Sequence, residues 1–331
     1  MKAILSEAPG GPETLILRDL PVPEPVAGEV RVAVSAVGVN FPDTLIIQDK
    51  YQFRPDRPFA PGAEFAGVIE AVGEGVDGFA PGDRVMALPM WGAMAEHVCL
   101  PAAECHRLPD AVSDEAAAAL QMTYGTALYA LESRGDLVAG ETVVVLGAAG
   151  GVGLAAVELA HALGARVVAC ASTEEKVGVA RGHGATEGIV YSSGEMDREA
   201  QKVFGGQLKQ VVGENGADIV LDAVGGGYTE PALRCMGWGG RLLIVGFPAG
   251  IAQIPANLPL LKSCDIRGIF WGAAIKRDPA AHAAAMDRLL ALVADGRIAP
   301  HIHARYRLDS AGEAIAALSA RGVTGKVLVT P

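Results

Sequence analysis

The stretch VVVLGAAGGVG, residues 143–153, decides the fold of this chain. Its apolar run predicts a buried strand, its glycines predict a turn, and the following run Leu154–Leu163 predicts a helix. A strand, a glycine turn and a helix in this order bind the pyrophosphate of a dinucleotide. Glycine lets the backbone approach the phosphates, and the helix start offers free N–H groups. Glycine clusters also occur in purely structural turns, but the strand and helix patterns around this one favour binding.

The region that contains this stretch and the region before it differ in their sequence patterns. In residues 121–265, apolar runs that predict strands alternate with helical runs, which is typical of a parallel sheet. These strands are expected at Val143–Leu146, Arg166–Cys170, Gly188–Tyr191, Asp218–Leu221 and Gly240–Val245. Residues 1–120 instead carry short alternating runs such as Glu29–Val37 between glycines and prolines. Such runs predict a β-rich, barrel-like domain.

The C-terminal part is expected to return to the first domain. Its pattern predicts a strand over Asp265–Trp271, a helix over Pro279–Asp295 and a strand over Lys326–Val329. A dinucleotide fold is nearly complete by residue 265, so we expect residues 266–331 to complete the domain begun by 1–120. The predicted fold class is therefore α/β, with a doubly wound domain between two parts of a β-rich domain.

The composition excludes several classes of function. Of the 331 residues, 50% are hydrophobic, which suffices for a full core, and the net charge of −11 argues against nucleic acid or a membrane surface as a partner. No apolar run approaches the ~20 residues of a membrane span. The first residues lack the apolar stretch of a signal peptide, so we expect a cytoplasmic protein. The five scattered cysteines are typical of reduced thiols.

The end of the second predicted strand indicates which nicotinamide cofactor binds. An acidic residue at this place binds the ribose 2′-hydroxyl of NAD and repels a 2′-phosphate. Here the strand is followed by Ser172 and Thr173, with Lys176 one turn later, and these side chains suit a phosphate. Glu174 and Glu175 begin the next helix and complement its dipole, although one of them can still point at a ribose. The pattern favours NADPH.

Several segments, in order along nearly the whole chain, resemble the zinc-free quinone oxidoreductases of the medium-chain dehydrogenase/reductase superfamily. They are AVGVNFPD (36–43), PGAEFAGVIEAVG (61–73), PGDRV (81–85), LQMTYGTALYAL (120–131), AGETVVVLGAAGGVG (139–153), STEEKVGVARGHGA (172–185), GGRLLIVG (239–246) and TGKVLV (324–329). The resemblance implies a GroES-like catalytic domain built from both chain ends and a Rossmann domain between them. It also implies NADPH in the cleft between the domains, and a homodimer.

The chain departs from the zinc enzymes of this superfamily at their ligand positions. Asn40 stands where those enzymes have a catalytic cysteine, and Ala63 stands where they have a histidine. The region of their structural zinc offers only Cys99 and Cys105 here, with His97 and His106 nearby, and the spacing fits no usual zinc module. We therefore expect no metal. Without a Lewis acid, alcohol oxidation is disfavoured, and quinones and α,β-unsaturated carbonyls are the expected hydride acceptors.

Three residues of the N-terminal domain are candidate catalytic residues, and for two of them, Asn40 and Tyr51, the resemblance implies the role. Asn40 would hydrogen-bond the acceptor carbonyl or the nicotinamide ribose, although an asparagine before Phe41-Pro42 also suits a turn. Asp43 would orient Asn40 or a water molecule, or equally cap a helix over Thr44–Gln48. Tyr51 matches a tyrosine of the nicotinamide pocket, where a phenol stacks on the acceptor or donates a proton. It is otherwise an ordinary loop aromatic.

The expected cofactor contacts come from the glycine turn and from the ends of the other strands. Some of them have a plain alternative, as surface residues (Tyr191, Arg321) or as fillers of a dimer seam (Phe270, Trp271). The full expected set is Asn40, Thr126, Ala149, Gly150, Gly151, Val152, Ser172, Thr173, Lys176, Tyr191, Val224, Gly246, Phe247, Phe270, Trp271 and Arg321.

Two other functions compete with an NADPH-dependent quinone or enone reductase. The first is an enoyl-CoA or acryloyl-CoA type reductase on the same fold, in which Arg54 and Arg57 would hold the CoA phosphates. The second is a non-catalytic NADPH-binding sensor. Turnover on a panel of acceptors separates the reductases from the sensor, and a selective effect of the two arginines on CoA substrates separates the reductases from each other.

Overall fold

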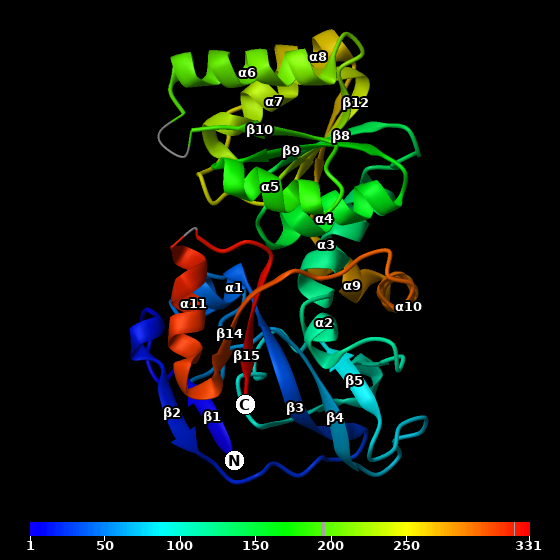
Figure 1. Ribbon diagram of the computed structural model, residues 1–331. Helices are drawn as coiled ribbons and strands as arrows, with labels where there is room; N and C mark the ends of the chain where they lie inside the picture. Colours follow the sequence, from blue (N-terminus) through cyan, green and yellow to red (C-terminus); the bar gives the residue numbers. More distant parts are fainter. Residues whose placement is uncertain (193–195, 321) are drawn as a thin grey trace. The chain divides into compact units, whose positions relative to one another are not determined.

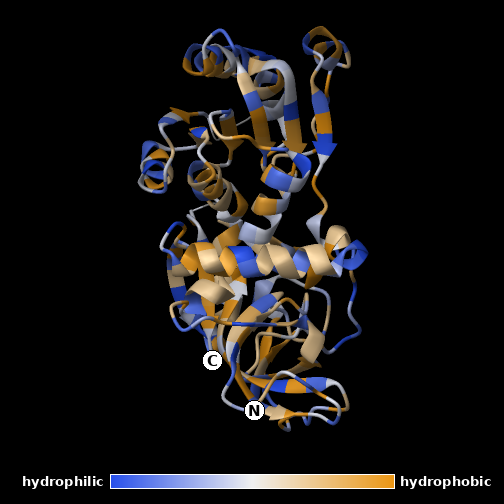
Figure 2. Cartoon of the chain, turned by 90° about the vertical axis from the view of Figure 1, so that its right-hand side faces the viewer, coloured by the Kyte–Doolittle hydropathy of each residue, from blue (hydrophilic) through white to orange (hydrophobic). Residues whose placement is uncertain are grey.

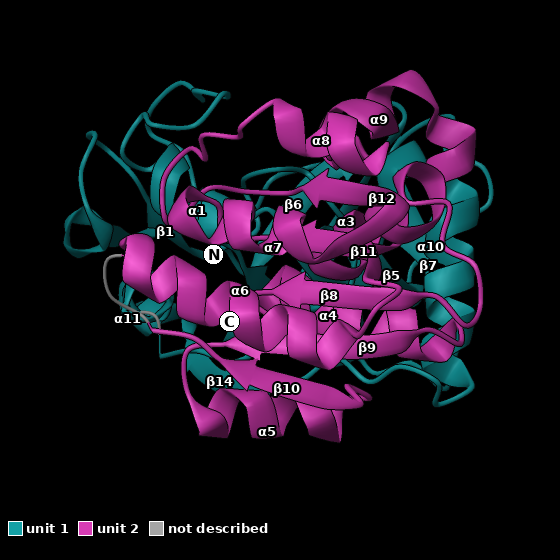
Figure 3. Ribbon diagram, turned by 90° about the horizontal axis from the view of Figure 1, so that it is seen from above, with its two compact units in different colours: residues 1–122, 283–331 teal, residues 123–282 magenta. Residues whose placement is uncertain are grey.

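The protein is described by a computed structural model that covers residues 1–192, 196–320 and 322–331. The chain divides into two compact units, residues 1–122 with 283–331 and residues 123–282, which Figure 3 shows in different colours. The second boundary lies later than the residue 266 expected from the sequence. Strand β13 (Asp265–Gly268) pairs with β12 (Met236–Ile244), so it belongs to the sheet of the second unit.

The second unit contains a six-stranded parallel sheet in the order β10–β9–β8–β11–β12–β13. Its other strands are β8 (Thr142–Leu146), β9 (Arg166–Ala171), β10 (Glu187–Val190) and β11 (Ala217–Asp222). The strand order reverses beside β8, which is the doubly wound arrangement that the sequence predicts. The expected strand Asp265–Trp271 is shorter than predicted, because the chain turns after Gly268 and helix α9 begins at Trp271.

Helices cover both faces of this sheet (Figure 1). Helices α4 (Gly151–Ala162) and α5 (Glu174–Gly182) lie on one face, and α6 (Arg198–Val212), α7 (Thr229–Cys235) and α8 (Asn257–Lys262) lie on the other. With both faces covered, the central strands are almost uniformly apolar and fully buried, and Figure 2 shows hydrophobic residues along them. The remaining helical segments are η3 (Gln121–Gly125), which begins in the first unit, and α3 (Thr126–Leu128), η4 (Tyr129–Arg134), η5 (Gly226–Tyr228) and α9 (Trp271–Arg277).

The first unit is built on a seven-stranded, mostly antiparallel sheet in the order β14–β15–β3–β4–β5–β7, with β6 paired to β3. Its long strand β3 alternates buried and half-buried residues over its first part, as the alternating sequence predicts. The strands are β3 (Glu29–Val39), β4 (Glu64–Val72), β5 (Arg84–Ala87), β6 (His97–Pro101), β7 (Cys105–Arg107), β14 (Ile302–Arg307) and β15 (Lys326–Thr330), and a separate pair is β1 (Lys2–Leu5) with β2 (Ile16–Asp19).

The C-terminal strands complete this sheet, because β15 lies between β14 and β3. The pairing brings Lys326 and its neighbours beside the end of β3, more than 280 residues earlier in the chain. Helix α10 runs from the second unit into the first. The helical segments are η1 (Pro12–Thr14), α1 (Phe41–Ile46), η2 (Ala102–Glu104), α2 (Asp114–Ala118), α10 (Pro279–Ala294), η6 (Leu308–Ser310) and α11 (Ala311–Ser319).

Candidate functional site

The glycine turn of the second unit has the geometry of a phosphate-binding loop. It connects the end of β8 to the start of α4 at Gly151, and Gly147 has a left-handed backbone with φ of +72°. A Cβ atom on Gly153 would lie only 2.1 Å from the carbonyl oxygen of Gly147, so that position accepts no side chain without moving the backbone. The start of α4 presents backbone N–H groups and the positive end of the helix dipole, which fit a pyrophosphate.

The parallel sheet brings most of the expected cofactor residues to one edge. Since all six strands run in one direction, the segments that follow β8, β9, β10, β11 and β12 leave the sheet at its carboxyl edge. These segments contain Ala149, Gly150, Gly151, Val152, Ser172, Thr173, Lys176, Tyr191, Val224, Gly246 and Phe247. The expected Arg321 lies outside the described residues. Thr126 begins α3 and is half-buried.

Ser172 and Lys176 lie together at the end of β9. The ammonium Nζ of Lys176 donates to Ser172 Oγ at 3.4 Å. Thr173 is the N-cap of α5, and its hydroxyl accepts from the backbone N–H of Lys176 at 3.2 Å. Glu174 and Glu175 are exposed in the first turn of α5, where they complement the helix dipole. A hydroxyl and a cation thus stand side by side at the end of β9, and groups of these two kinds suit a phosphate.

Tyr191 supports the glycine loop from below the sheet edge. Its ring packs against Tyr228 and Phe204, with ring centroids 4.8 Å and 5.7 Å away, and the residue is buried. Burial raises the pKa of its phenol, while a hydrogen bond from the Gly147 backbone acts in the opposite direction. Tyr191 therefore holds the loop in place through its hydroxyl.

Asp222 is a residue of this edge that the sequence analysis missed. Its buried carboxylate accepts from the backbone N–H groups of Val224 and Gly225, at 2.9 Å and 2.8 Å, and from the Thr229 hydroxyl at 2.5 Å. It therefore fixes the turn that carries Val224. The signal that points to it is an acidic residue at the end of an apolar strand, three residues before the glycines that begin at Gly225.

The aromatic residues expected near the nicotinamide differ in exposure. Phe247 and Phe270 are about half exposed, whereas Trp271 is buried. The ring of Trp271 fills the space beside Gly125, where an added Cβ would lie 2.4 Å from Trp271 Cζ2. Trp271 thus has a packing role within the second unit, which leaves its backbone groups as the means of contacting a cofactor.

The candidate site of the first unit is a buried hydrogen-bond network around Asn40. The amide Nδ2 of Asn40 donates to Glu64 Oε1 at 2.9 Å and to the Gly38 carbonyl at 3.0 Å. Its Oδ1 accepts from Lys326 Nζ at 2.6 Å, and Lys326 Nζ also lies 2.6 Å from Glu64 Oε1. Asn40, Glu64 and Lys326 are 4%, 1% and 3% exposed. Glu64 and Lys326 lie in segments that carry the family resemblance, but neither has a role predicted from the sequence.

Asp43 lies beside this network and closes the start of α1. Its Oδ2 accepts from the Asn40 backbone N–H at 2.7 Å, and its Oδ1 accepts from Gly62 N–H at 3.1 Å. Asn40 is the N-cap of α1, so the helix begins earlier than the expected Thr44, and the Asp43 carboxylate accepts from the N-cap backbone N–H while the Asp43 N–H donates to the Asn40 carbonyl. Burial raises the pKa of Asp43 to about 6, against the opposing effect of these N–H groups.

Tyr51 lies within electrostatic range of Asp43. Desolvation raises the pKa of its phenol, and the Asp43 charge raises it further. The ring packs on the core of the first unit and against Phe53, with centroids 5.8 Å apart. Arg57, considered above for CoA binding, is held by Asp49 at 2.8 Å and by the Ile47 carbonyl at 3.0 Å. These bonds argue against Arg57 as a free phosphate ligand.

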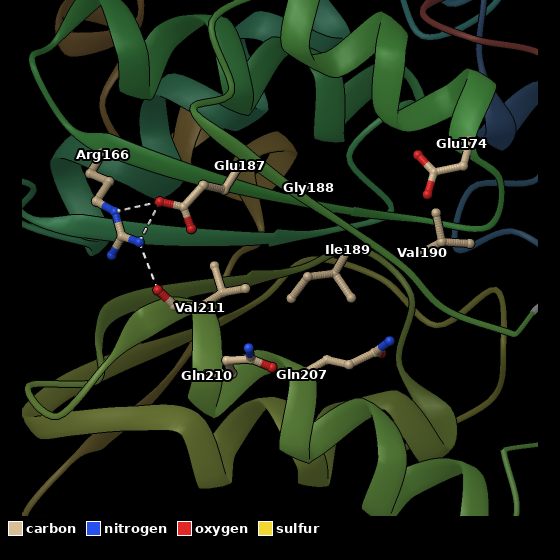
Figure 4. A pocket seen from close by; sticks show the side chains of 9 residues that line it. All are labelled: Arg166, Glu174, Glu187, Gly188, Ile189, Val190, Gln207, Gln210 and Val211. Carbon is tan, nitrogen blue, oxygen red and sulfur yellow. Dashed lines mark hydrogen bonds and ion pairs between the residues drawn. The ribbon is translucent and has the colours of Figure 1, made fainter.

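A pocket of about 530 Å³ lies elsewhere in the second unit, beside the edge strand β10 (Figure 4). Arg166 and Glu187 form an ion pair of 2.6 Å at one end, and Glu174 lies at the other end. Its lining contains none of the expected cofactor residues, so it is separate from the glycine loop. Within the described ranges, no three His, Cys, Asp or Glu side chains form a group that could hold a metal, and no helix is long and apolar enough to cross a membrane.

Comparisons with known proteins identify the family. Residues 26–110 match the family model "Alcohol dehydrogenase GroES-like domain", and residues 151–291 match "Zinc-binding dehydrogenase". The chain is 39% identical to the quinone oxidoreductase-like protein 2 of Bos taurus, over 93% of this chain and 87% of that protein. It is 33% identical to the quinone oxidoreductase of Homo sapiens, over 99% and 97%.

A solved structure supports the same family and the same fold. The quinone oxidoreductase of Escherichia coli, complexed with NADPH, is 29% identical and superimposes with a TM-score of 0.89 over all of both chains. The predicted combination of a GroES-like domain and a Rossmann-type sheet is confirmed. With relatives of this identity along nearly its whole length, the chain belongs to the quinone oxidoreductase family of medium-chain dehydrogenases/reductases.

Proposed function

We propose that this protein is an NADPH-dependent oxidoreductase that transfers a hydride to quinones or α,β-unsaturated carbonyls without a metal. The observation that carries the proposal is the Ser172–Lys176 pair at the end of β9, next to a glycine loop that accepts a pyrophosphate. The NADPH complex of the Escherichia coli relative supports the choice of cofactor. The residues at the former zinc-ligand positions, Asn40 and the buried Ala63, support metal-free chemistry.

The residues of both units have distinct tasks in this reaction. When bound, NADPH supplies the hydride, and the acceptor must also gain a proton. The glycine loop holds the pyrophosphate, Lys176 holds the 2′-phosphate, and Tyr51 donates the proton to the reduced acceptor. Asn40 hydrogen-bonds the acceptor carbonyl or the nicotinamide ribose, in a position fixed by Asp43. Thr126, Val224, Gly246, Phe247 and the backbone of Phe270 and Trp271 complete the cofactor site.

An assay of NADPH oxidation with several quinones and enones tests the proposal directly. We expect turnover with NADPH on members of both acceptor classes. If NADPH is not consumed with any acceptor, the reductase function is wrong, and tight binding without turnover would favour the sensor. The engaged Arg57 makes a preference for CoA thioesters unexpected.

We predict that the activity falls as the pH drops below about 6. Ionised Asp43 accepts two backbone N–H groups, and protonation removes part of that acceptor capacity and loosens Asn40. The effect of Asp43 protonation on the folding stability has the opposite sign to its effect on activity. Because the folded pKa of about 6 lies above the ordinary aspartate pKa of 3.8, the Asp43 contribution to stability is fully present below pH 3.8 and is lost as the pH rises through 6.

The measurement is the pH profile of kcat/KM together with the unfolding midpoint at each pH. Asp43→Asn should remove the acidic limb, because asparagine does not titrate in this range. A limb near pH 6 that persists in this variant would show that another group causes it. Loss of activity that coincides with unfolding would also contradict the prediction, since Asp43 acts on stability in the other direction.

We further propose a homodimer, formed through the β13 edge of the second unit. This edge strand carries Ile266, and the nearby helix α8 exposes Leu260 and Leu261, which are 78% and 66% exposed. An apolar edge strand is unfavourable in water unless another strand pairs with it. Ile266→Lys should yield a monomer in sedimentation experiments. Val203→Lys, at an exposed apolar site on α6, is the matched control and should leave the mass unchanged.

A further inference from the structure

The hydrogen-bonding capacity of Asn40 is almost entirely used inside the first unit. A primary amide has two N–H donors and two acceptor lone pairs. Both donors of Asn40 are engaged, one by Glu64 Oε1 and one by the Gly38 carbonyl. One lone pair of Oδ1 accepts from Lys326 Nζ. What Asn40 can still offer a ligand is therefore a single lone pair, which can accept a hydrogen bond but cannot donate one.

Lys326 and Glu64 determine this orientation. The three ammonium protons of Lys326 have three acceptors, namely Glu64 Oε1, Asn40 Oδ1 and the Val39 carbonyl at 3.1 Å. Glu64 Oε2 accepts from the backbone N–H of Met122 at 2.8 Å, so both of its oxygens are engaged. Turning the Asn40 amide over would set its NH₂ group against the ammonium and its oxygen against the carboxylate. The buried ion pair thus permits one orientation of the amide.

We propose that Lys326 and Glu64 are positioning residues that lock Asn40 as a hydrogen-bond acceptor. Locked in this way, Asn40 accepts from a hydroxyl group, which the nicotinamide ribose supplies, and does not donate to the carbonyl oxygen of the electron acceptor. The inference rests on the proposed function for the identity of the hydroxyl, and it selects one of the two roles left open for Asn40. The hydrogen bond to the acceptor carbonyl then has to come from another donor, such as Tyr51.

The test uses a double variant, Lys326→Met with Glu64→Gln, because it removes both charges together and leaves no buried ion unpaired. The amide of Asn40 can then turn over. We expect the dissociation constant of NADPH to rise about tenfold, the effect of one lost hydrogen bond. Turnover with 1-benzyl-1,4-dihydronicotinamide, a hydride donor without a ribose, should fall by a smaller factor than turnover with NADPH. The single variant Lys326→Arg keeps the cation beside Glu64. Its NADPH affinity should therefore lie between those of the double variant and the wild type.

One further measurement and a control variant make the test independent of turnover and of folding. In the cofactor-free wild-type protein, the side-chain NH₂ of Asn40 should exchange slowly with solvent in ¹⁵N NMR spectra, and fast exchange would overturn the lock. The matched control is Arg305→Met with Glu115→Gln, which removes an exposed ion pair of 2.6 Å in the same unit. It should change neither the dissociation constant of NADPH nor the exchange rate of the Asn40 NH₂ group.

The outcomes separate this inference from the proposed function. A folded double variant that binds NADPH as tightly as the wild type would overturn the positioning role alone. An equal loss of turnover with NADPH and with the ribose-free donor would overturn it too, because the effect would not depend on the ribose. A wild-type protein with a slowly exchanging Asn40 amide that does not bind NADPH would keep the lock and overturn the proposed function and the assignment to a ribose.

Discussion

Lys176→Ala is expected to raise the dissociation constant of NADPH by roughly 10–150-fold, the range for a lost hydrogen bond to a charged group. The constant for NADH should change little. The structure places Lys176 Nζ 3.4 Å from Ser172 Oγ at the end of β9, where a doubly wound sheet presents the adenosine ribose. The cation and the hydroxyl are both suited to the 2′-phosphate, which NADH lacks. The measurement is a fluorescence titration with each reduced cofactor.

Two companion variants sharpen this prediction. Ser172→Asp introduces a carboxylate at the strand end, so it should reverse the cofactor preference toward NADH. Lys202→Ala removes an exposed lysine on α6 and serves as the control for a general change in charge. Equal losses for NADPH and NADH in Lys176→Ala would show that Lys176 does not contact the 2′-phosphate, and the choice of cofactor would then need another basis.

The features that the sequence predicted well are local. The glycine turn and the strands on either side of it depend on residues within a few positions of each other, where turn, strand and cap preferences act directly. Ser172 and Lys176 lie together, and their binding of a phosphate stays a prediction. The doubly wound order followed from the alternation of strands and helices. The end of β13 was less predictable, since an apolar run such as Asp265–Trp271 fits both a strand and a helix start.

Local sequence patterns could not predict the hydrogen-bond network around Asn40. Lys326 lies 286 residues from Asn40 and 262 from Glu64, and the pairing of β3 with both β15 and β4 brings the three residues together. A single lysine or glutamate in a sequence is far more often exposed than buried, so neither residue by itself indicates a buried network. Tyr191 shows the same limit. It was predicted as the last residue of a strand over Gly188–Tyr191, but its packing against Tyr228 and Phe204 depends on other elements.

The single variant Lys326→Met should lower the free energy of unfolding by about 3–5 kcal/mol, the cost of removing one partner from a buried ion pair. Glu64, which is 1% exposed, would be left without its counter-ion, and Asn40 Oδ1 and the Val39 carbonyl would each lose a donor. Urea unfolding of the wild type, both single variants and the double variant measures the effect and the coupling between the two residues.

The double variant is the decisive comparison in this series. If the cost of Lys326→Met comes from the stranded Glu64 charge, then Glu64→Gln in the same chain should recover most of it, since the glutamine can still accept from Met122 N–H and carries no charge. If instead the methionine simply fits badly, the double variant should be no more stable than the single one. Arg305→Met, which breaks an exposed pair with Glu115, should cost much less than Lys326→Met, because water solvates the carboxylate left behind. A small loss in Lys326→Met would mean that water reaches Glu64, and Asn40 would then be free to turn over in the wild type as well.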